Sequence, residues 1–525
     1  MRLLLVLLCV LVAGGSVSAA DLKLLTAGAY KPAALELVAE FEKKTGHKVT
    51  IDNGTAGAFK EILDAIAQAQ HFVFIADWSF QPMFTPTHGS TMADTIGSKL
   101  IAKAASALVA VHTWDHTNIA APDPQNDGAD DVFDEMAGGT RPKKLLWRAS
   151  SHDQSGMSHH QKYVLLDAPG PGGRRVLKAF FGGLDLTQGR FDWGEHPILP
   201  DDPRCAKFRT SLKLGDESYN DWYNAEFSGK LDLPRQPWHD IHGVIEGPAA
   251  WDFVREFVGR WNVDPSWVDA MGDDGGDDIE AVLKVFKSLF DPAKFVQQWE
   301  PHPGPWDARV CRSMFKSHWA EDEKTETPAQ HGTRREFQWR VSGGFERSIQ
   351  LAYRQAIDQA EKFVYIESQY FALPAVVDLV EPKLADPDGP EFVVVTTNKA
   401  EGWLEHLVMA RNRECLFARL READRWNRVR LLYPANRGPE DQHPTPIGVH
   451  AKLLIVDDHL LRVGSSNLNQ RSTGLDTECD IALEASDDAA REAIRRLRAD
   501  LLAEHLGIAP AAVAAMLADT GSLVA

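Results

Sequence analysis

Between Glu61 and Phe80 the spacing of apolar residues changes from helical to continuous. Apolar residues first recur at positions 62, 63, 66 and 69, and an unbroken apolar run then begins at Phe72. This order predicts an amphipathic helix followed by a buried strand. The stretch from Ala352 to Phe371 repeats it. Helical and β-rich runs continue to alternate after both stretches, which indicates an α/β fold.

The two stretches are separated by a fixed interval. Phe72 aligns with Phe363, an offset of 363 − 72 = 291 residues. A second phrase, H-x-K followed after four residues by D, begins at His160 and again at His450, an offset of 450 − 160 = 290 residues. Two independent patterns with nearly one period predict a duplicated α/β lobe.

The chain begins with a pattern typical of a secretory signal. Arg2 precedes an apolar run that ends at Ala13, and small residues follow up to Asp21. This predicts a cleavable signal peptide and a secreted or periplasmic protein. No later stretch is apolar enough over the length needed to span a bilayer. The predicted divisions are a signal peptide at 1–20, a leader at 21–58, a first lobe at 59–262, an irregular inter-lobe region at 263–334, and a second lobe with C-terminal helices at 335–525.

The leader at 21–58 reads as strand, glycine turn, helix, strand and glycine-rich turn. It resembles the opening of the periplasmic molybdate-type binding proteins, in which hydroxyls and helix N-termini hold an oxyanion. The resemblance stops where the first copy of the repeat begins. It leaves two alternatives, a working anion receptor and a vestigial leader.

The repeated phrase carries the candidate chemistry. On a strand, residues i and i+2 face the same side, so His160 projects with Lys162 and His450 projects with Lys452. If the lobes face each other about a pseudo-two-fold axis, the four side chains converge. Two lysines then favour an anionic ligand, while two imidazoles supply the nucleophile and the acid that phosphoester cleavage requires.

The residues that follow each phrase extend the candidate site. Asp167 and Asp457 fall on the opposite strand face from the lysines, which indicates a structural role at a turn. At the end of the next strand, glycine lets a backbone approach a ligand, and Ser and Asn can donate to phosphate oxygens. The predicted phosphate-binding residues are Gly182, Gly183 and Asp185 in the first copy and Gly464, Ser465 and Asn467 in the second.

The second copy resembles the phospholipase D superfamily motif H-x-K-x(4)-D-x(6)-G-S-x-N at every position, and the first copy has Gly-Gly in place of Gly-Ser. The stretches "GGLDLTQGRFD", "PRQPWHDIHGVIEGPAAWD" and "FVYIESQYF" resemble the phosphatidylcholine-hydrolysing branch. This resemblance, over roughly residues 60–510, implies two lobes, each a mixed β-sheet flanked by helices, with one shared active site between them.

The resemblance also implies roles for individual residues. Catalysis would pass through a phosphohistidine without a catalytic metal or cofactor, with His160 as nucleophile and His450 as general acid and then base. The resemblance counts the lysines, Asp167 and Asp457 among the catalytic motif residues. It assigns Asp240 and Glu478 to orienting the histidines. The implied partner is a phospholipid at a membrane or micelle surface, and the chain is expected to act as a monomer.

Composition bears on the alternatives. The net charge is −19 and no basic run stands out, so nucleic acid is not an expected partner. The alternatives left open are a phosphodiesterase or nuclease, a cardiolipin-synthase-like phosphatidyltransferase using the same site, and a non-catalytic periplasmic anion-binding protein. Four cysteines could form two disulfides or remain reduced in a core: Cys205, Cys311, Cys415 and Cys479.

Overall fold

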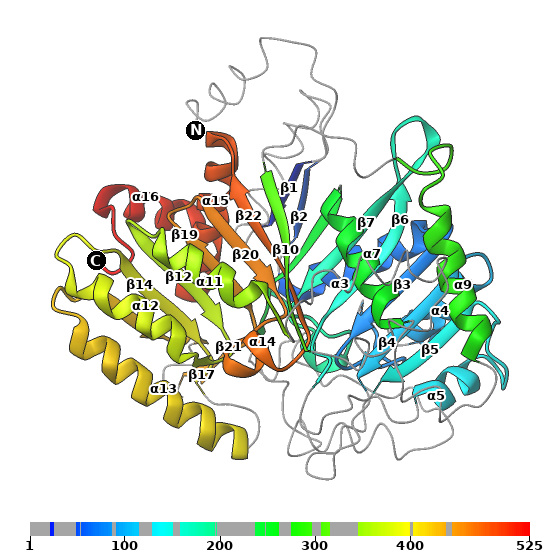
Figure 1. Ribbon diagram of the computed structural model, residues 1–525, viewed down its shortest axis with the longest axis horizontal. Helices are drawn as coiled ribbons and strands as arrows, with labels where there is room; N and C mark the ends of the chain where they lie inside the picture. The colour runs from blue at the N-terminus through cyan, green and yellow to red at the C-terminus, as the bar shows by residue number, and fades with distance from the viewer. Residues whose placement is uncertain are drawn as a thin grey trace, which may run out of the picture.

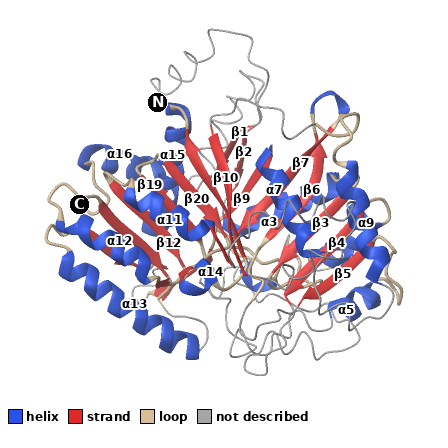
Figure 2. Ribbon diagram, in the orientation of Figure 1, coloured by secondary structure: helices blue, strands red, loops and turns tan. Residues whose placement is uncertain are grey.

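The protein is built from two α/β lobes that lie side by side, with their strands converging toward the middle of the molecule (Figures 1 and 2). The computed structural model describes residues 22–25, 49–52, 54–86, 91–114, 129–150, 158–194, 196, 237–246, 248–261, 275–296, 306–315, 345–398, 403–436 and 444–525.

The first lobe contains a six-stranded sheet in the order β5-β4-β3-β6-β7-β9. Strands β3, β4 and β5 are parallel, and β6, β7 and β9 continue the sheet in antiparallel pairs. The elements are α3 (Gly54–Gln68), β3 (Phe72–Asp77), α4 (Ile96–Ala104), β4 (Leu108–Trp114), α5 (Ala129–Met136), β5 (Leu145–Ser150), β6 (Tyr163–Pro169), β7 (Arg175–Gly182), β9 (His242–Glu246) and α7 (Pro248–Trp261).

The second lobe repeats this order strand for strand, as β15-β14-β12-β19-β20-β22. Two further strands, β10 (Trp306–Phe315) and β11 (Phe345–Arg347), extend the sheet beyond β22. The repeated elements are α11 (Ser348–Asp358), β12 (Phe363–Ser368), α12 (Pro374–Ala385), β14 (Glu391–Thr396), α13 (Trp403–Ala423), β15 (Val429–Leu432), β19 (Lys452–Val456), β20 (Leu460–Gly464), β22 (Glu478–Ala485) and α15 (Asp488–Leu506). The predicted duplication and the mixed sheets are confirmed.

Burial on both faces explains why β3 reads as a continuous apolar run. Phe72 and Phe74 point into a central core that also contains Tyr365 of the second lobe, whereas Val73 and Ile75 pack in an outer core with helices α3 and α4. A third core lies between the second sheet and helices α11, α12 and α13. Because the central core draws side chains from both lobes, it fixes the lobes against each other.

Several predicted boundaries differ from the structure. The stretch 263–334 is not irregular throughout, because it contains helix α9 (Gly275–Ser288) and strand β10. Helix α3 begins at Gly54, so the predicted leader boundary at residue 58 falls inside it. The expected strands of the leader are present as β1 (Leu22–Leu25) and β2 (Val49–Asp52), a parallel pair. The helix expected between these two strands lies outside the described residues, and so does the predicted signal peptide.

The C-terminal region forms α15 and α16 (Pro510–Thr520). Helix α15 ends at Leu506 and is capped by Gly507, which has the left-handed conformation that favours glycine. Within the described ranges, no single helix is long and apolar enough to span a membrane. Taken together, α15 and α16 reach the required length and apolarity, but the two helices are bent by 111° relative to each other. Among the described cysteines Cys311, Cys415 and Cys479 are free thiols, and Cys205 lies outside the described residues.

Candidate active site

The two H-x-K phrases lie at the same edge of their sheets. Lys452 is the first residue of β19 and pairs with Ser368, the last residue of β12. Lys162 directly precedes β6, so His160 lies in the extended segment leading into the strand rather than within it. Each lysine turns back to its own motif: Lys162 Nζ donates to the His160 carbonyl at 3.1 Å, and Lys452 Nζ donates to the His450 carbonyl.

Each phrase is also bonded to the opposite lobe. The His160 N–H donates to the carbonyl of Thr477 at 3.0 Å, and the His450 N–H donates to the carbonyl of His239 at 2.8 Å. On the second side this contact continues as a short parallel pair between β8 (Trp238–His239) and β18 (Gly448–Val449). The backbone of each motif is therefore positioned by the lobe that does not carry it.

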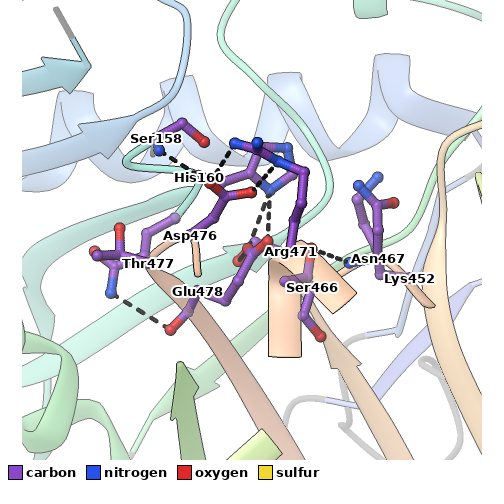
Figure 3. Close-up of polar contacts among 12 residues, drawn as sticks. Ser158, His160, Lys452, Ser466, Asn467, Arg471, Asp476, Thr477 and Glu478 are labelled. Atoms are coloured by element: carbon purple, nitrogen blue, oxygen red, sulfur yellow. Dashed lines mark hydrogen bonds and ion pairs between the residues drawn. The ribbon is translucent and has the colours of Figure 1, made fainter. Parts of the chain in front are cut away.

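The residue that follows each of these carbonyls is an acid that orients the histidine. His160 Nδ1 lies 3.0 Å from both carboxylate oxygens of Glu478 (Figure 3), and His450 Nδ1 lies 2.7 Å from Asp240 Oδ2. A carboxylate that accepts the Nδ1 proton fixes the tautomer and leaves Nε2 available for chemistry. The predicted orienting acids thus lie where they are needed, and each acts on the histidine of the other lobe.

Burial dominates the electrostatics of the histidines. It lowers the pKa of His160 well below its usual value, and the charges of Lys162 and Lys452 lower it further. The pKa of His450 is lowered well below its usual value in the same way, by burial first and then by Lys452, with a smaller contribution from His160. Both rings are therefore neutral at neutral pH, which is the state a nucleophilic Nε2 requires.

Burial also shifts the pKa values of two side chains close to the histidines, Glu478 and Lys452. It raises the pKa of Glu478 to about 8, although a hydrogen bond from Ser465 opposes the shift. It lowers the pKa of Lys452 to about 7, although the charge of Asp240 opposes the shift. Lys452 therefore loses its positive charge at a pH close to 7, whereas an exposed lysine stays charged there.

The Lys452 shift predicts a fall of kcat/KM on the alkaline side of neutrality. The ammonium is charged below its pKa of about 7 and loses its proton as the pH rises through that value, so attraction for a phosphodiester decreases. In the variant Lys452→Arg the cation stays protonated, and this fall should disappear. Profiles of kcat/KM against pH for both proteins test the prediction, and an unchanged alkaline limb in the variant would contradict it.

Two tryptophans that the sequence reasoning missed contact the histidines, and a third stacks on one of them. Trp78 lies edge-on to His160, with ring centroids 6.1 Å apart, and stacks on Trp114 at 5.8 Å. On the other side the Trp238 ring lies 5.0 Å from the His450 ring. Trp78 directly follows β3 and Trp114 is the last residue of β4, a position at the strand ends that could have identified them. They surround the histidines with apolar surface, which accounts for the strong effect of burial on the pKa values.

Two of the three glycines predicted to bind phosphate are packed against carboxylates. A Cβ atom on Gly183 would overlap the Asp240 carboxylate, and one on Gly464 would overlap Asp480. Gly182 has φ +152°, a conformation that L side chains rarely adopt. The Ser465 hydroxyl donates to Glu478 Oε2 at 2.5 Å. Ser465 therefore positions the acid that orients His160, rather than standing free for a phosphate.

The contacts of Asp185 argue against its predicted phosphate-binding role. Its buried carboxylate lies 3.2 Å from Lys162 Nζ and 3.4 Å from Arg190 Nε. Burial acts to raise its pKa, but Lys162 and Arg190 outweigh this and lower it, so the group is an anion that would repel a phosphate. Its neighbour Asp77 has a pKa raised well above the usual value by burial and by Asp185. Asp185 orients Lys162.

Asn467 remains a candidate phosphate-binding residue. Its buried Oδ1 finds no hydrogen-bond partner within the described part of the chain. The oxygen and nitrogen of an amide are interchanged by a flip, so the same position can present the donor to a phosphate oxygen.

Asp167 and Asp457 bond the chain at the start of a central strand and, within the described contacts, neither His160 nor His450, which corrects their inclusion among the catalytic residues. Asp167 accepts the backbone N–H groups of residues 70–72, and Asp457 accepts those of residues 361–363, at 2.7–3.3 Å. These ranges differ by the repeat offset of 291 residues. Both acids cap the start of a central strand at the end away from the site, as the strand-face argument predicted.

Residues 65–375, more than half of the chain, match the family described as "Phospholipase D", and residues 353–501 match the family described as "Cardiolipin synthase, PLD-like domain". The chain belongs to the phospholipase D family. The resemblance inferred from the two motifs is therefore confirmed, as is the prediction of a phospholipase D-type enzyme at the level of the family.

Curated relatives are consistent with membership of the phospholipase D family. The chain is 27% identical to phospholipase D alpha 1 of Zea mays over 548 residues, which cover 86% of this chain and 63% of that protein. It is also 27% identical to phospholipase D alpha 2 of Arabidopsis thaliana, covering 86% of this chain and 64% of that protein. The chain thus spans less than two thirds of the length of these relatives.

A solved structure has a similar fold. Phosphatidylserine synthase of Haemophilus influenzae Rd KW20 superposes with a TM-score of 0.51 over 89% of this chain and 92% of that one, at 11% identity. At this identity the similarity concerns the arrangement of the two lobes alone.

Proposed function

We propose that this protein is an exported phospholipase D that hydrolyses the distal phosphodiester of a phosphatidylcholine-like glycerophospholipid to phosphatidate and the head-group alcohol. The observation that carries the proposal is the crossed pairing of two buried imidazoles, each oriented through Nδ1 by an acid of the opposite lobe. With two lysines beside them, the histidines are suited to a phosphoryl group placed between two Nε2 atoms.

The chemistry follows from these positions. His160 Nε2 attacks phosphorus, the bond to the head-group oxygen breaks, and that oxygen takes a proton from His450 Nε2. His450 then removes a proton from water, whose oxygen attacks the phosphatidyl-His160 intermediate and releases phosphatidate. Lys162 and Lys452 depress the histidine pKa values in the free protein, and a bound phosphodiester offsets their charge, which favours the protonated His450 that the first step requires.

Three features favour a lipid over a nucleic acid. The net charge is −19, the relatives described above are named phospholipase D alpha, and the site is flanked by tryptophans. The second candidate function is phosphatidyl transfer to an alcohol at the same site, which the cardiolipin synthase-like match of the second lobe favours. Export rests on the signal-like N-terminus, and N-terminal sequencing of the exported protein would test it.

Choline release from phosphatidylcholine vesicles tests the proposal. We expect release by the wild-type protein and none by His160→Asn, measured with and without added Ca²⁺. Added ethanol should divert product to phosphatidylethanol if the intermediate accepts alcohols. A folded wild-type protein that releases no head group, but cleaves DNA or bis-p-nitrophenyl phosphate, would favour the phosphodiesterase alternative instead.

Molybdate provides a control for the leader. If residues 21–58 form a working anion receptor, molybdate or sulfate should raise the Tm of the full chain. No shift is expected if the leader is a strand-containing appendage, of which β1 and β2 are the described part.

A further inference from the structure

Behind Asp240 lies a buried group of histidines and carboxylates that the proposed reaction does not use. We call it the inter-lobe histidine cluster, and its members are His196, His239, Glu367, Glu504 and His505. The first lobe contributes His196 and His239, whereas β12 and α15 of the second lobe contribute the rest. Within the described chain, these residues make up both groups of ligand-type side chains whose donor atoms lie within 4.8 Å of one another.

Two imidazole nitrogens in this cluster converge on one carboxylate oxygen. His196 Nε2 lies 3.0 Å and His239 Nδ1 lies 2.5 Å from Glu504 Oε1. A zinc ion with ligands at about 2.0–2.1 Å in tetrahedral geometry separates its ligand atoms by about 3.3 Å. To admit an ion, the distance from Glu504 Oε1 would have to lengthen by about 0.3 Å for His196 and by about 0.8 Å for His239.

The second nitrogen of each ring supports this arrangement. His196 Nδ1 bonds Asp192 Oδ2 at 2.8 Å, and His239 Nε2 bonds Glu367 Oε2 at 2.7 Å. A histidine that binds a metal through one nitrogen almost always donates the other N–H to a carboxylate, carbonyl or water, which fixes the tautomer. Both histidines have a carboxylate in this position. Glu504 faces the other nitrogen of each ring, and these contacts raise the pKa of His196 to about 9 and that of His239 well above its usual value although burial opposes the shift, so an ion would have to displace one proton from each ring.

The backbone of His196 provides an independent observation. It has φ +46°, which is uncommon for a residue other than glycine, and its side chain is 4% exposed. Strain of this kind persists where the surrounding structure fixes a residue, and it gathers at ligand clamps.

We propose that His196, His239 and Glu504 bind one divalent transition-metal ion of the Zn²⁺ class, with water at the remaining position. Two imidazoles and one carboxylate suit zinc, whereas calcium and magnesium prefer oxygen ligands alone. The Glu504 side chain is 13% exposed, which gives the ion a route from solvent. The alternative group formed by His239, Glu367 and His505 lacks a carboxylate on the second nitrogen of His505 among the described contacts.

The metal site would affect catalysis indirectly, through the residues that position His450. The backbone carbonyl of His239 accepts a hydrogen bond from the His450 N–H, and the next residue, Asp240, binds the His450 ring through its carboxylate. Because Glu504 belongs to α15 of the second lobe, an ion joining it to His239 would tie the lobes together beside this contact. We therefore assign the ion a positioning role, and no step of the reaction passes through it.

Cobalt titration of the untagged full chain after chelator treatment tests the proposal. The expected result is one Co²⁺ per chain with the visible absorption of a tetrahedral ion, displacement by Zn²⁺, and a higher Tm in the loaded protein. His196→Gln should abolish this uptake, and Asp192→Asn should weaken it by about 10–100-fold.

Two variants control for other histidines. His459→Gln removes a surface histidine whose Nε2 lies 2.9 Å from Glu484, and His160→Asn removes one of the two active-site imidazoles. Both should bind Co²⁺ like the wild type. If His196→Gln fails to fold, Glu504→Gln serves in its place. A wild-type protein that takes up no ion, with no change in Tm, would show that hydrogen bonds alone hold the cluster and would overturn the proposal.

Discussion

Replacing either His160 or His450 by asparagine is expected to lower kcat by at least about 10³-fold, with Tm nearly unchanged. The side-chain amide of asparagine can still donate one hydrogen bond to the acid that each histidine now contacts, so a buried carboxylate is not left without a partner. Rates of head-group release and thermal unfolding curves test the two parts. Substantial activity in either variant would refute the shared site.

The same two variants show which histidine is the nucleophile and which is the general acid. Phosphatidyl-p-nitrophenol has a leaving group that needs no proton, so His450→Asn should release about one p-nitrophenolate per chain in a burst and then stop, as the intermediate on His160 accumulates. His160→Asn should show no burst. A burst in His160→Asn instead would assign the nucleophile to His450.

The second large effect is expected from Asp240→Asn. Asp240 Oδ1 accepts the N–H of Ile241 at 2.8 Å, while Oδ2 binds His450 Nδ1. An asparagine must keep its oxygen toward Ile241, so its NH₂ group faces Nδ1 and forces the wrong tautomer on His450. We expect a loss in kcat of about 10²–10⁴-fold, measured by choline release.

Two variants provide matched comparisons for Asp240→Asn. Both oxygens of Glu478 lie 3.0 Å from His160 Nδ1, and one of them accepts a hydrogen bond from the Ser465 hydroxyl, which can rotate. The side-chain amide of Glu478→Gln can therefore still turn its oxygen toward His160 Nδ1, so this variant should lose less activity than Asp240→Asn. Asp457→Asn disturbs the far end of the second lobe, so it should lower Tm with little change in kcat. Equal losses in all three would contradict the crossed arrangement.

Much of the fold was predictable because periodicity is a local property of the sequence. The 290- and 291-residue offsets identified the repeat, and the structure repeats six strands in one order. The apolar run of β3 was recognisable because both its faces are buried. The regular elements α9 and β10 were missed because the stretch around them is rich in Gly, Pro and charged residues, and β10 becomes a strand by pairing with the distant β22.

The prediction included the reactive groups and the two orienting acids, but not the contacts that hold the lysines and acids in place. His160, Lys162, His450 and Lys452 carry a motif, so position in the sequence was enough. The contacts of Asp185 with Lys162 and of Ser465 with Glu478 were not predicted, because they are set by packing. The inter-lobe histidine cluster left only one local signal, the charged Glu367 within the apolar strand β12.

The sequence by itself determined that two copies of one α/β lobe exist and that each carries a histidine and a lysine at the same place. Only the tertiary structure decided that Glu478 of the second lobe orients His160 of the first, and that Asp240 orients His450 in return. The physical reason is range. Local spacing fixes which face of a strand a side chain takes, whereas pairing across the lobes depends on how the central core packs them together.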